Sequence, residues 1–127
     1  MTIGILLFTR IAETYAYQRL TEVGQAKGHT VRLLYKNDFS FRHTSNGIEI
    51  SYEDKPFEGV DVIIARQNFS EEPSLHTHAT DTLEKSGIPV LNGHARFSLA
   101  KNKIAQRLVL QEAGIAMPPW VIIHEVY

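Results

Sequence analysis

The sequence repeats one unit three times: an apolar segment of strand length, a segment with helical spacing, and then a glycine. The glycines are Gly28, Gly87 and Gly114. Glycine is favoured just past a helix because the residue there often takes a left-handed backbone conformation. Alternation of strands and helices predicts parallel strands joined by right-handed crossovers. We therefore expect an α/β fold: a doubly wound, Rossmann-like parallel sheet with strand order 2-1-3-4 and helices on both faces.

The expected elements follow from the spacing of the apolar residues. Strands are expected at 3–8, 31–35, 60–65 and 88–91, and helices at 12–23, 71–86 and 100–113. The strand segments are almost continuously apolar, as is typical of strands covered on both faces. Residues 38–57 interrupt this pattern. Ile48, Ile50 and Tyr52 alternate there with polar residues, which predicts an extra hairpin or an irregular excursion near the sheet edge.

Composition excludes several classes of partner. The 127 residues fit one domain, and 13 basic and 14 acidic side chains are mixed along the chain. There is no basic stripe for nucleic acid and no polybasic run for a membrane surface. The first residues do not resemble a signal peptide, and no apolar run approaches the roughly 20 residues that span a bilayer. We expect a cytoplasmic protein with no nucleic-acid or membrane partner.

Several familiar sites are absent from the sequence. The turn at 8–13 contains no glycine, which excludes a dinucleotide fingerprint and a Walker loop after the first strand. Without cysteine there is no disulfide and no zinc–sulfur site. His76 and His78 are two residues apart on an expected helix and therefore point to different faces. We expect no metal site in the chain.

Candidate binding residues follow the expected strands, because open parallel sheets bind ligands at the carboxyl ends of their strands. Arg10, Arg66 and Asn92 follow the first, third and fourth strands. Two guanidinium groups near one edge could clamp a carboxylate or phosphate. Arg10 and Arg66 are therefore predicted to bind substrate. A loop or cap role is the alternative for such residues, and for Arg66 an ion pair with Asp38.

The last segment predicts a domain boundary. Pro118 and Pro119 mark a turn after the third helix, and an apolar strand is expected from residue 120. A strand there has little chain left to pair with. We expect one domain at 1–117 and, at 118–127, the start of a link into a further domain.

Five segments, taken in order, carry a family resemblance: 3–15, 27–32, 57–66, 88–92 and 102–118. Together they resemble the N-terminal pre-ATP-grasp domain of the ATP-grasp ligases. The similarity is greatest to the RimK-type branch, which includes a glutamate ligase that modifies a ribosomal protein and is related to glutathione synthetase. Two positions depart from the family pattern: Asn102 replaces the usual aspartate and Ala65 the usual proline. Asparagine also caps helices well, so the local structure should be retained at residue 102.

The resemblance implies the substrate-side domain of an ATP-dependent carboxylate–amine ligase, which forms an amide bond through an acyl phosphate. An α-L-glutamate ligase is one such activity. ATP and Mg²⁺ would be bound mainly by a C-terminal ATP-grasp domain of the same protein, and the substrate would be a small-molecule or peptide carboxylate. Arg10, Arg66 and Asn92 would contact substrate. This chain would supply no catalytic or metal-binding residue, and alone it would be inactive.

The resemblance also implies that Lys103 reaches the nucleotide phosphates. An apolar stripe, Phe97, Ala100, Ile104 and Leu108, is expected to fix the helix face by packing. The lysine stem would then extend past that face, and a solvated helix lysine like Lys101 is the alternative. For the whole chain the alternative is a stand-alone flavodoxin-like module that binds a small molecule or protein without catalysis. The oligomeric state is left open, with a homo-oligomer among the alternatives.

Overall fold

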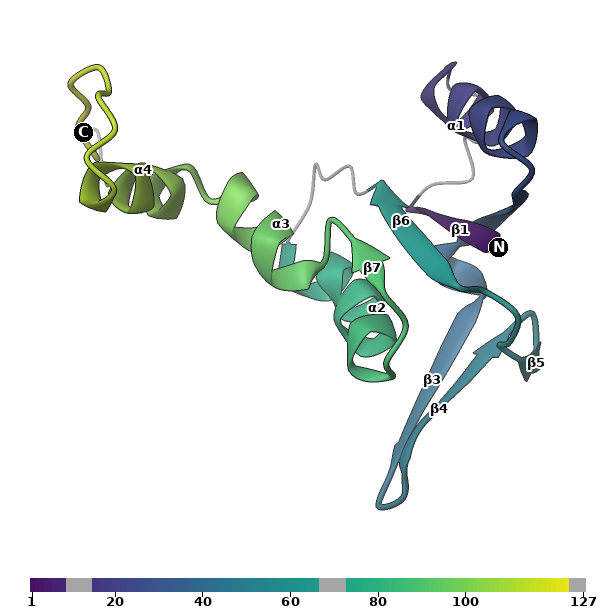
Figure 1. Cartoon of the computed structure of the whole chain (residues 1–127). Coiled ribbons are helices and arrows are strands. Elements are labelled where there is room, and N and C mark those ends of the chain that lie inside the picture. Colours follow the sequence, from purple (N-terminus) through teal and green to yellow (C-terminus); the bar gives the residue numbers. More distant parts are fainter. Residues whose placement is uncertain (9–14, 67–72, 124–127) are drawn as a thin grey trace.

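The computed structural model describes residues 1–8, 15–66 and 73–123, with the backbone alone for 73–76 (Figure 1). Its main sheet contains β1 (Thr2–Leu7), β2 (Thr30–Tyr35), β6 (Val62–Arg66) and β7 (Val90–Leu91). The helices are α1 (Tyr15–Ala26), α2 (Pro73–Lys85), α3 (His94–Lys101) and α4 (Lys103–Glu112). A 3-10 turn, η1 (Lys36–Asp38), leads into β3 (Phe39–Thr44), β4 (Gly47–Tyr52) and β5 (Lys55–Pro56).

The main sheet has the predicted topology. Its order is β2-β1-β6-β7, and every neighbouring pair is parallel. Counted along the chain these are the second, first, third and fourth parallel strands, so the predicted order 2-1-3-4 is confirmed. Strand β1 is central, and its last four residues are buried, which explains the nearly continuous apolar run at the start of the sequence.

Helices cover both faces of this sheet, as predicted. On one face Ile5 and Leu7 of β1 pack with Tyr17 of α1. On the other face Leu6 and Ile63 pack with Leu83 of α2. The alternation of side chains along each strand separates these two cores. The glycines that follow α1, α2 and α4 have positive φ angles of 77°, 93° and 70°, at Gly28, Gly87 and Gly114 respectively.

The interruption at 38–57 forms a second, antiparallel sheet in the order β3-β4-β5, which confirms the expected hairpin. In Figure 1 the β3–β4 hairpin extends away from the main sheet. Its base packs with the core on the α2 side, where the Phe39 ring lies 4.8 Å from the Tyr52 ring and 4.9 Å from the Phe57 ring, between centroids. Tyr35 N at the end of β2 donates a hydrogen bond of 3.1 Å to the Tyr52 hydroxyl, which ties the two sheets together.

The segment after β7 differs from the expected single helix. Helices α3 and α4 are separated at Asn102, whose φ of −78° and ψ of 97° are extended rather than helical. Asn102 N donates to Ser98 O at the end of α3, and its Oδ1 accepts from Ala105 N at 3.0 Å. Asparagine can thus end one helix and cap the next, because its side chain replaces a missing backbone partner.

This break divides the predicted apolar stripe between two helices. Ile104 and Leu108 of α4 are 44% and 48% exposed, so the expectation that packing fixes that helix face is wrong. The strand expected from residue 120 is also not found within the described part of the chain, where 115–123 is neither helix nor strand. The Trp120 ring instead lies 5.7 Å from the Arg107 guanidinium on α4. None of the helices in the described ranges is long and apolar enough to cross a membrane.

Candidate functional site

The carboxyl edge of the main sheet brings together two of the predicted binding residues. In the parallel register Ile64 of β6 lies beside Leu91 of β7, so the residues that follow in each strand are also neighbours. Asn92 Nδ2 donates a hydrogen bond of 3.3 Å to the carbonyl oxygen of Ala65. Arg66 ends β6 immediately after Ala65. The structure therefore places Arg66 and Asn92 at one edge, as the sequence predicts.

Asn92 also turns the chain from β7 into α3. Its φ is +62°, a left-handed conformation that asparagine tolerates better than most residues. The hydrogen bond from its side-chain amide to β6 holds this turn against the sheet edge. The Asn92 side chain therefore helps to position the turn.

Arg66 is exposed, and it lies in register with Leu7 of β1. It follows the buried Ala65, so strand alternation places it on the sheet face covered by α1. Among the described residues its side chain has no ion pair or hydrogen bond, and the alternative pairing with Asp38 is not formed. Arg10 lies outside the described residues, so the two-arginine clamp stays a prediction.

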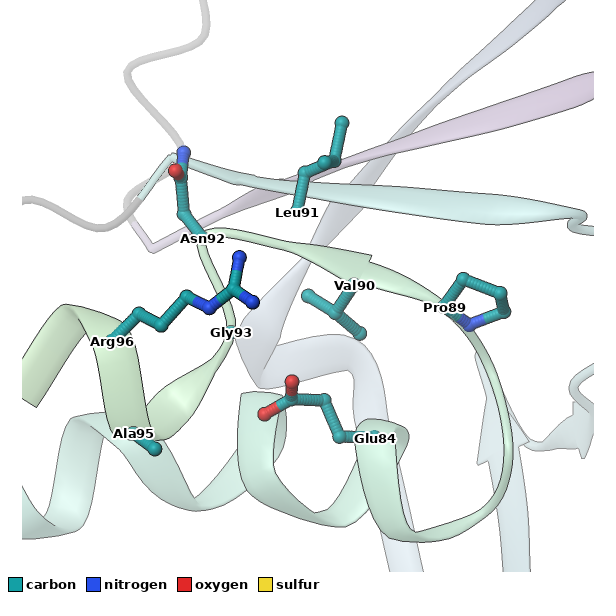
Figure 2. Close-up of a pocket in the computed structure, with 8 residues that line it drawn as sticks. All are labelled: Glu84, Pro89, Val90, Leu91, Asn92, Gly93, Ala95 and Arg96. Atoms are coloured by element: carbon teal, nitrogen blue, oxygen red, sulfur yellow. The ribbon is translucent and has the colours of Figure 1, made fainter.

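A hollow of about 390 Å³ opens beside Asn92, on the α2 side of the edge. Figure 2 shows that its walls come from the end of α2, strand β7 and the first turn of α3. Pro89 and Val90 supply apolar surface, whereas Glu84 and Arg96 supply opposite charges. The hollow thus combines apolar surface with two charged groups of opposite sign.

Glu84 fixes the geometry of the hollow. Its Oε2 accepts a hydrogen bond of 2.7 Å from His94 N, the first residue of α3. Gly93, the residue before α3, has no side chain to do this itself. The Glu84 carboxylate packs against Gly93 so closely that a Cβ there would collide with it. A negative charge at a helix N-terminus is favourable, so Glu84 locks α3 onto α2.

Arg96 and Glu84 are the site residues that the sequence reasoning missed. Arg96 is exposed and has no ion pair or hydrogen bond within the described ranges. The predicted substrate-binding residues all follow predicted strands, whereas both of these lie on helices. An arginine in the first turn of a helix that starts two residues after a strand was a signal that could have identified Arg96. Glu84 lies ten residues before His94 and reaches the site only through the packing of α2 against α3.

Lys103 lies apart from this edge, on the first turn of α4. Its Nζ donates to Ala100 O and to Gln106 Oε1, both at 3.3 Å. The whole of α3 separates it from Asn92, and α3 and α4 extend away from the sheet in Figure 1. The structure thus does not bring Lys103 together with Arg66 and Asn92. Among the described residues no group of three or more histidine, aspartate or glutamate side chains could hold a metal ion.

Comparison with known proteins agrees with this fold. The family model described as RimK PreATP-grasp domain matches residues 1–95. A probable alpha-L-glutamate ligase of Xanthomonas oryzae is 31% identical over 114 residues, which cover 90% of this chain and 38% of that protein. Its namesake in Xanthomonas campestris is 30% identical, covering 90% and 39%, and that in Stenotrophomonas maltophilia is 28% identical over 117 residues, also covering 90% and 39%.

The match to these relatives spans less than two-fifths of their length, although it takes in nearly all of this chain. The family model covers both faces of the sheet, from β1 to the start of α3. The chain therefore belongs to the RimK pre-ATP-grasp domain family.

Proposed function

We propose that this chain is the N-terminal, substrate-side domain of an ATP-dependent ligase that joins a carboxylate to an amine through an acyl phosphate. The observation that carries this proposal is the match of residues 1–95 to the RimK pre-ATP-grasp family. The relatives' printed name, probable alpha-L-glutamate ligase, supports L-glutamate as one of the two substrates. The second substrate would be a small-molecule or peptide carboxylate.

Binding of ATP and Mg²⁺ is assigned mainly to a further domain of the same protein. The match covers 38% of the relative from Xanthomonas oryzae, so more than half of that protein is left for such a domain. The charged groups around the hollow beside Asn92 are Arg96 and Glu84, whose carboxylate is engaged in a helix cap, a poor set for a hard divalent cation. This chain would then contribute contacts to the substrate rather than the phosphoryl-transfer machinery.

Within the chain, Arg66, Asn92 and Arg10 are proposed to bind the carboxylate substrate. Arg66 supports this role because its guanidinium is exposed at the carboxyl edge and is not engaged by another described residue. A planar guanidinium can hold a carboxylate through two parallel hydrogen bonds, which a lysine cannot reproduce. Arg66→Lys in the complete enzyme should therefore raise KM for the acid more than it lowers kcat.

The test is acyl-phosphate formation. A protein in which this chain continues into an ATP-binding domain should convert short peptides, as the carboxylate substrate, to hydroxamates when given ATP, Mg²⁺ and hydroxylamine in place of L-glutamate as the attacking amine. The 127-residue chain alone should produce neither hydroxamate nor ADP. ATPase activity of the short chain that a substitution within it abolishes would contradict the proposal. A reading frame that stops after residue 127 would favour the stand-alone binding module instead.

A further inference from the structure

We propose, on the basis of the ligase function above, that the hollow between α2, β7 and α3 binds the head group of a free α-amino acid. Arg96 would contact its carboxylate and Glu84 its ammonium group. Figure 2 shows that the guanidinium of Arg96 and the carboxylate of Glu84 are directed into the same hollow from α3 and α2.

The two charges are available to a ligand. Arg96 is exposed, and its side chain makes no ion pair or hydrogen bond in the parts of the chain that the structure describes. In particular, Arg96 and Glu84 do not pair with each other, although both line the hollow. One Glu84 oxygen accepts from His94 N, but a carboxylate has about four acceptor sites, so others remain for an ammonium group. A ligand with both charges can therefore bridge two groups that do not satisfy each other.

The hollow is also preformed, which lowers the entropic cost of binding. Glu84 is held by α3, and Asn92 by its bond to Ala65 O on β6. Glycine at 93 leaves the space in which the Glu84 carboxylate lies. Arg96 is then the main group that must be ordered on binding. The volume of about 390 Å³ is ample for an amino acid head group.

The pair of charges decides the chemical class. A site for phosphate or a simple carboxylate would place Glu84 as a repulsive neighbour of the anion. A site for an amine alone would suffer the same repulsion from Arg96. A zwitterion satisfies both groups at once, and charge-assisted hydrogen bonds are about twice as strong as neutral ones.

Three matched probes test this assignment on the 127-residue chain. L-alanine carries both charges, propionate lacks the ammonium group, and ethylamine lacks the carboxylate. Amide signals of Gly93, His94 and Arg96 would be followed by NMR during each titration. L-alanine should shift them saturably, with a dissociation constant on the order of 1–10 mM for so few contacts. Propionate and ethylamine should bind roughly tenfold more weakly or not measurably.

Variants separate the two contacts from structural effects. Arg96→Gln and Glu84→Gln should each weaken L-alanine binding roughly tenfold. Glutamine at 84 keeps an oxygen for His94 N, so α3 should remain capped and the remaining amide spectrum unchanged. Lys101→Gln on the same helix removes a positive charge away from the hollow and should leave binding unchanged. Equal affinity for L-alanine and propionate, unaltered binding by both variants, or no saturable shift would overturn the proposal.

The outcome is independent of the ligation assay, because it needs neither ATP nor a further domain. A ligase-active longer protein whose N-terminal chain ignores L-alanine would reject the hollow but keep the ligase function. If the chain binds L-alanine but the complete protein has no ligase activity, the ligase function is rejected and the amino acid site in the hollow is kept.

Discussion

Glu84 and Gly93 depend on each other although they lie on different elements. The carboxylate reaches the first amide of α3 only because Gly93 carries no side chain. Gly93 has a φ of −58°, so alanine could adopt its backbone conformation without strain. The requirement for glycine at this position is therefore one of space.

Gly93→Ala should lower the free energy of unfolding by about 1 kcal/mol, because the new Cβ displaces the flexible Glu84 carboxylate and the α3 cap is lost. In a Glu84→Ala background the same substitution should instead stabilise the chain slightly, since alanine restricts the unfolded state more than glycine. Urea denaturation of the four proteins in this cycle measures both values. An equal cost in the two backgrounds would show that Gly93 is required for another reason.

At the same scale, the candidate site was partly predictable. Arg66 and Asn92 directly follow strands, and the strands were clear from their apolar runs. Arg96 and Glu84 were not found because their positions depend on how α2 packs against α3. That packing brings Glu84 into contact with His94, ten residues later, and the periodicity of a single helix does not predict such a contact.

At the scale of elements, Asn102 determines that α3 and α4 are two helices. Asn102→Ala should remove the bond to Ala105 N and lower the stability of α4 by about 1 kcal/mol. Asn102→Asp should keep the cap, because aspartate is an equally good cap residue and its charge is favourable at an N-terminus. Hydrogen exchange of the α4 amides should accelerate only in the alanine variant. Slower exchange in that variant would mean that α3 and α4 fuse.

The parallel sheet was predictable because its strands and glycine stops repeat, and the hairpin because its residues alternate in polarity. The capping role of Asn102 was also predictable, because asparagine is a good cap residue, but the break between α3 and α4 was not, since the apolar stripe continues across it from Phe97 to Leu108. Periodicity reports side-chain spacing, whereas the break comes from one backbone conformation and one side-chain hydrogen bond. The described residues 120–123 form no strand, whereas the link into a further domain expected at 118–127 stays a prediction.

At the scale of the whole molecule, Lys103 lies beyond α3 at the start of α4, away from the carboxyl edge of the sheet. In the complete protein Lys103→Ala should weaken ATP use, seen as a higher KM for ATP, if its ammonium group follows the phosphates. The loss should exceed the few tenths of a kcal/mol typical of surface substitutions. Lys101→Ala, two residues earlier and also exposed, is the matched control. The same result for both lysines would assign Lys103 to the solvated surface.

Asn102 is the point at which a change of backbone conformation would alter the angle between α3 and α4. A ten-residue helix such as α4 is about 15 Å long, and a single non-helical residue connects it to α3. A rotation of about 20° at that residue would carry the far end of α4 through about 5 Å. In such a rotation Lys103, one residue from Asn102, would hardly move, whereas the far end of α4 would be displaced most.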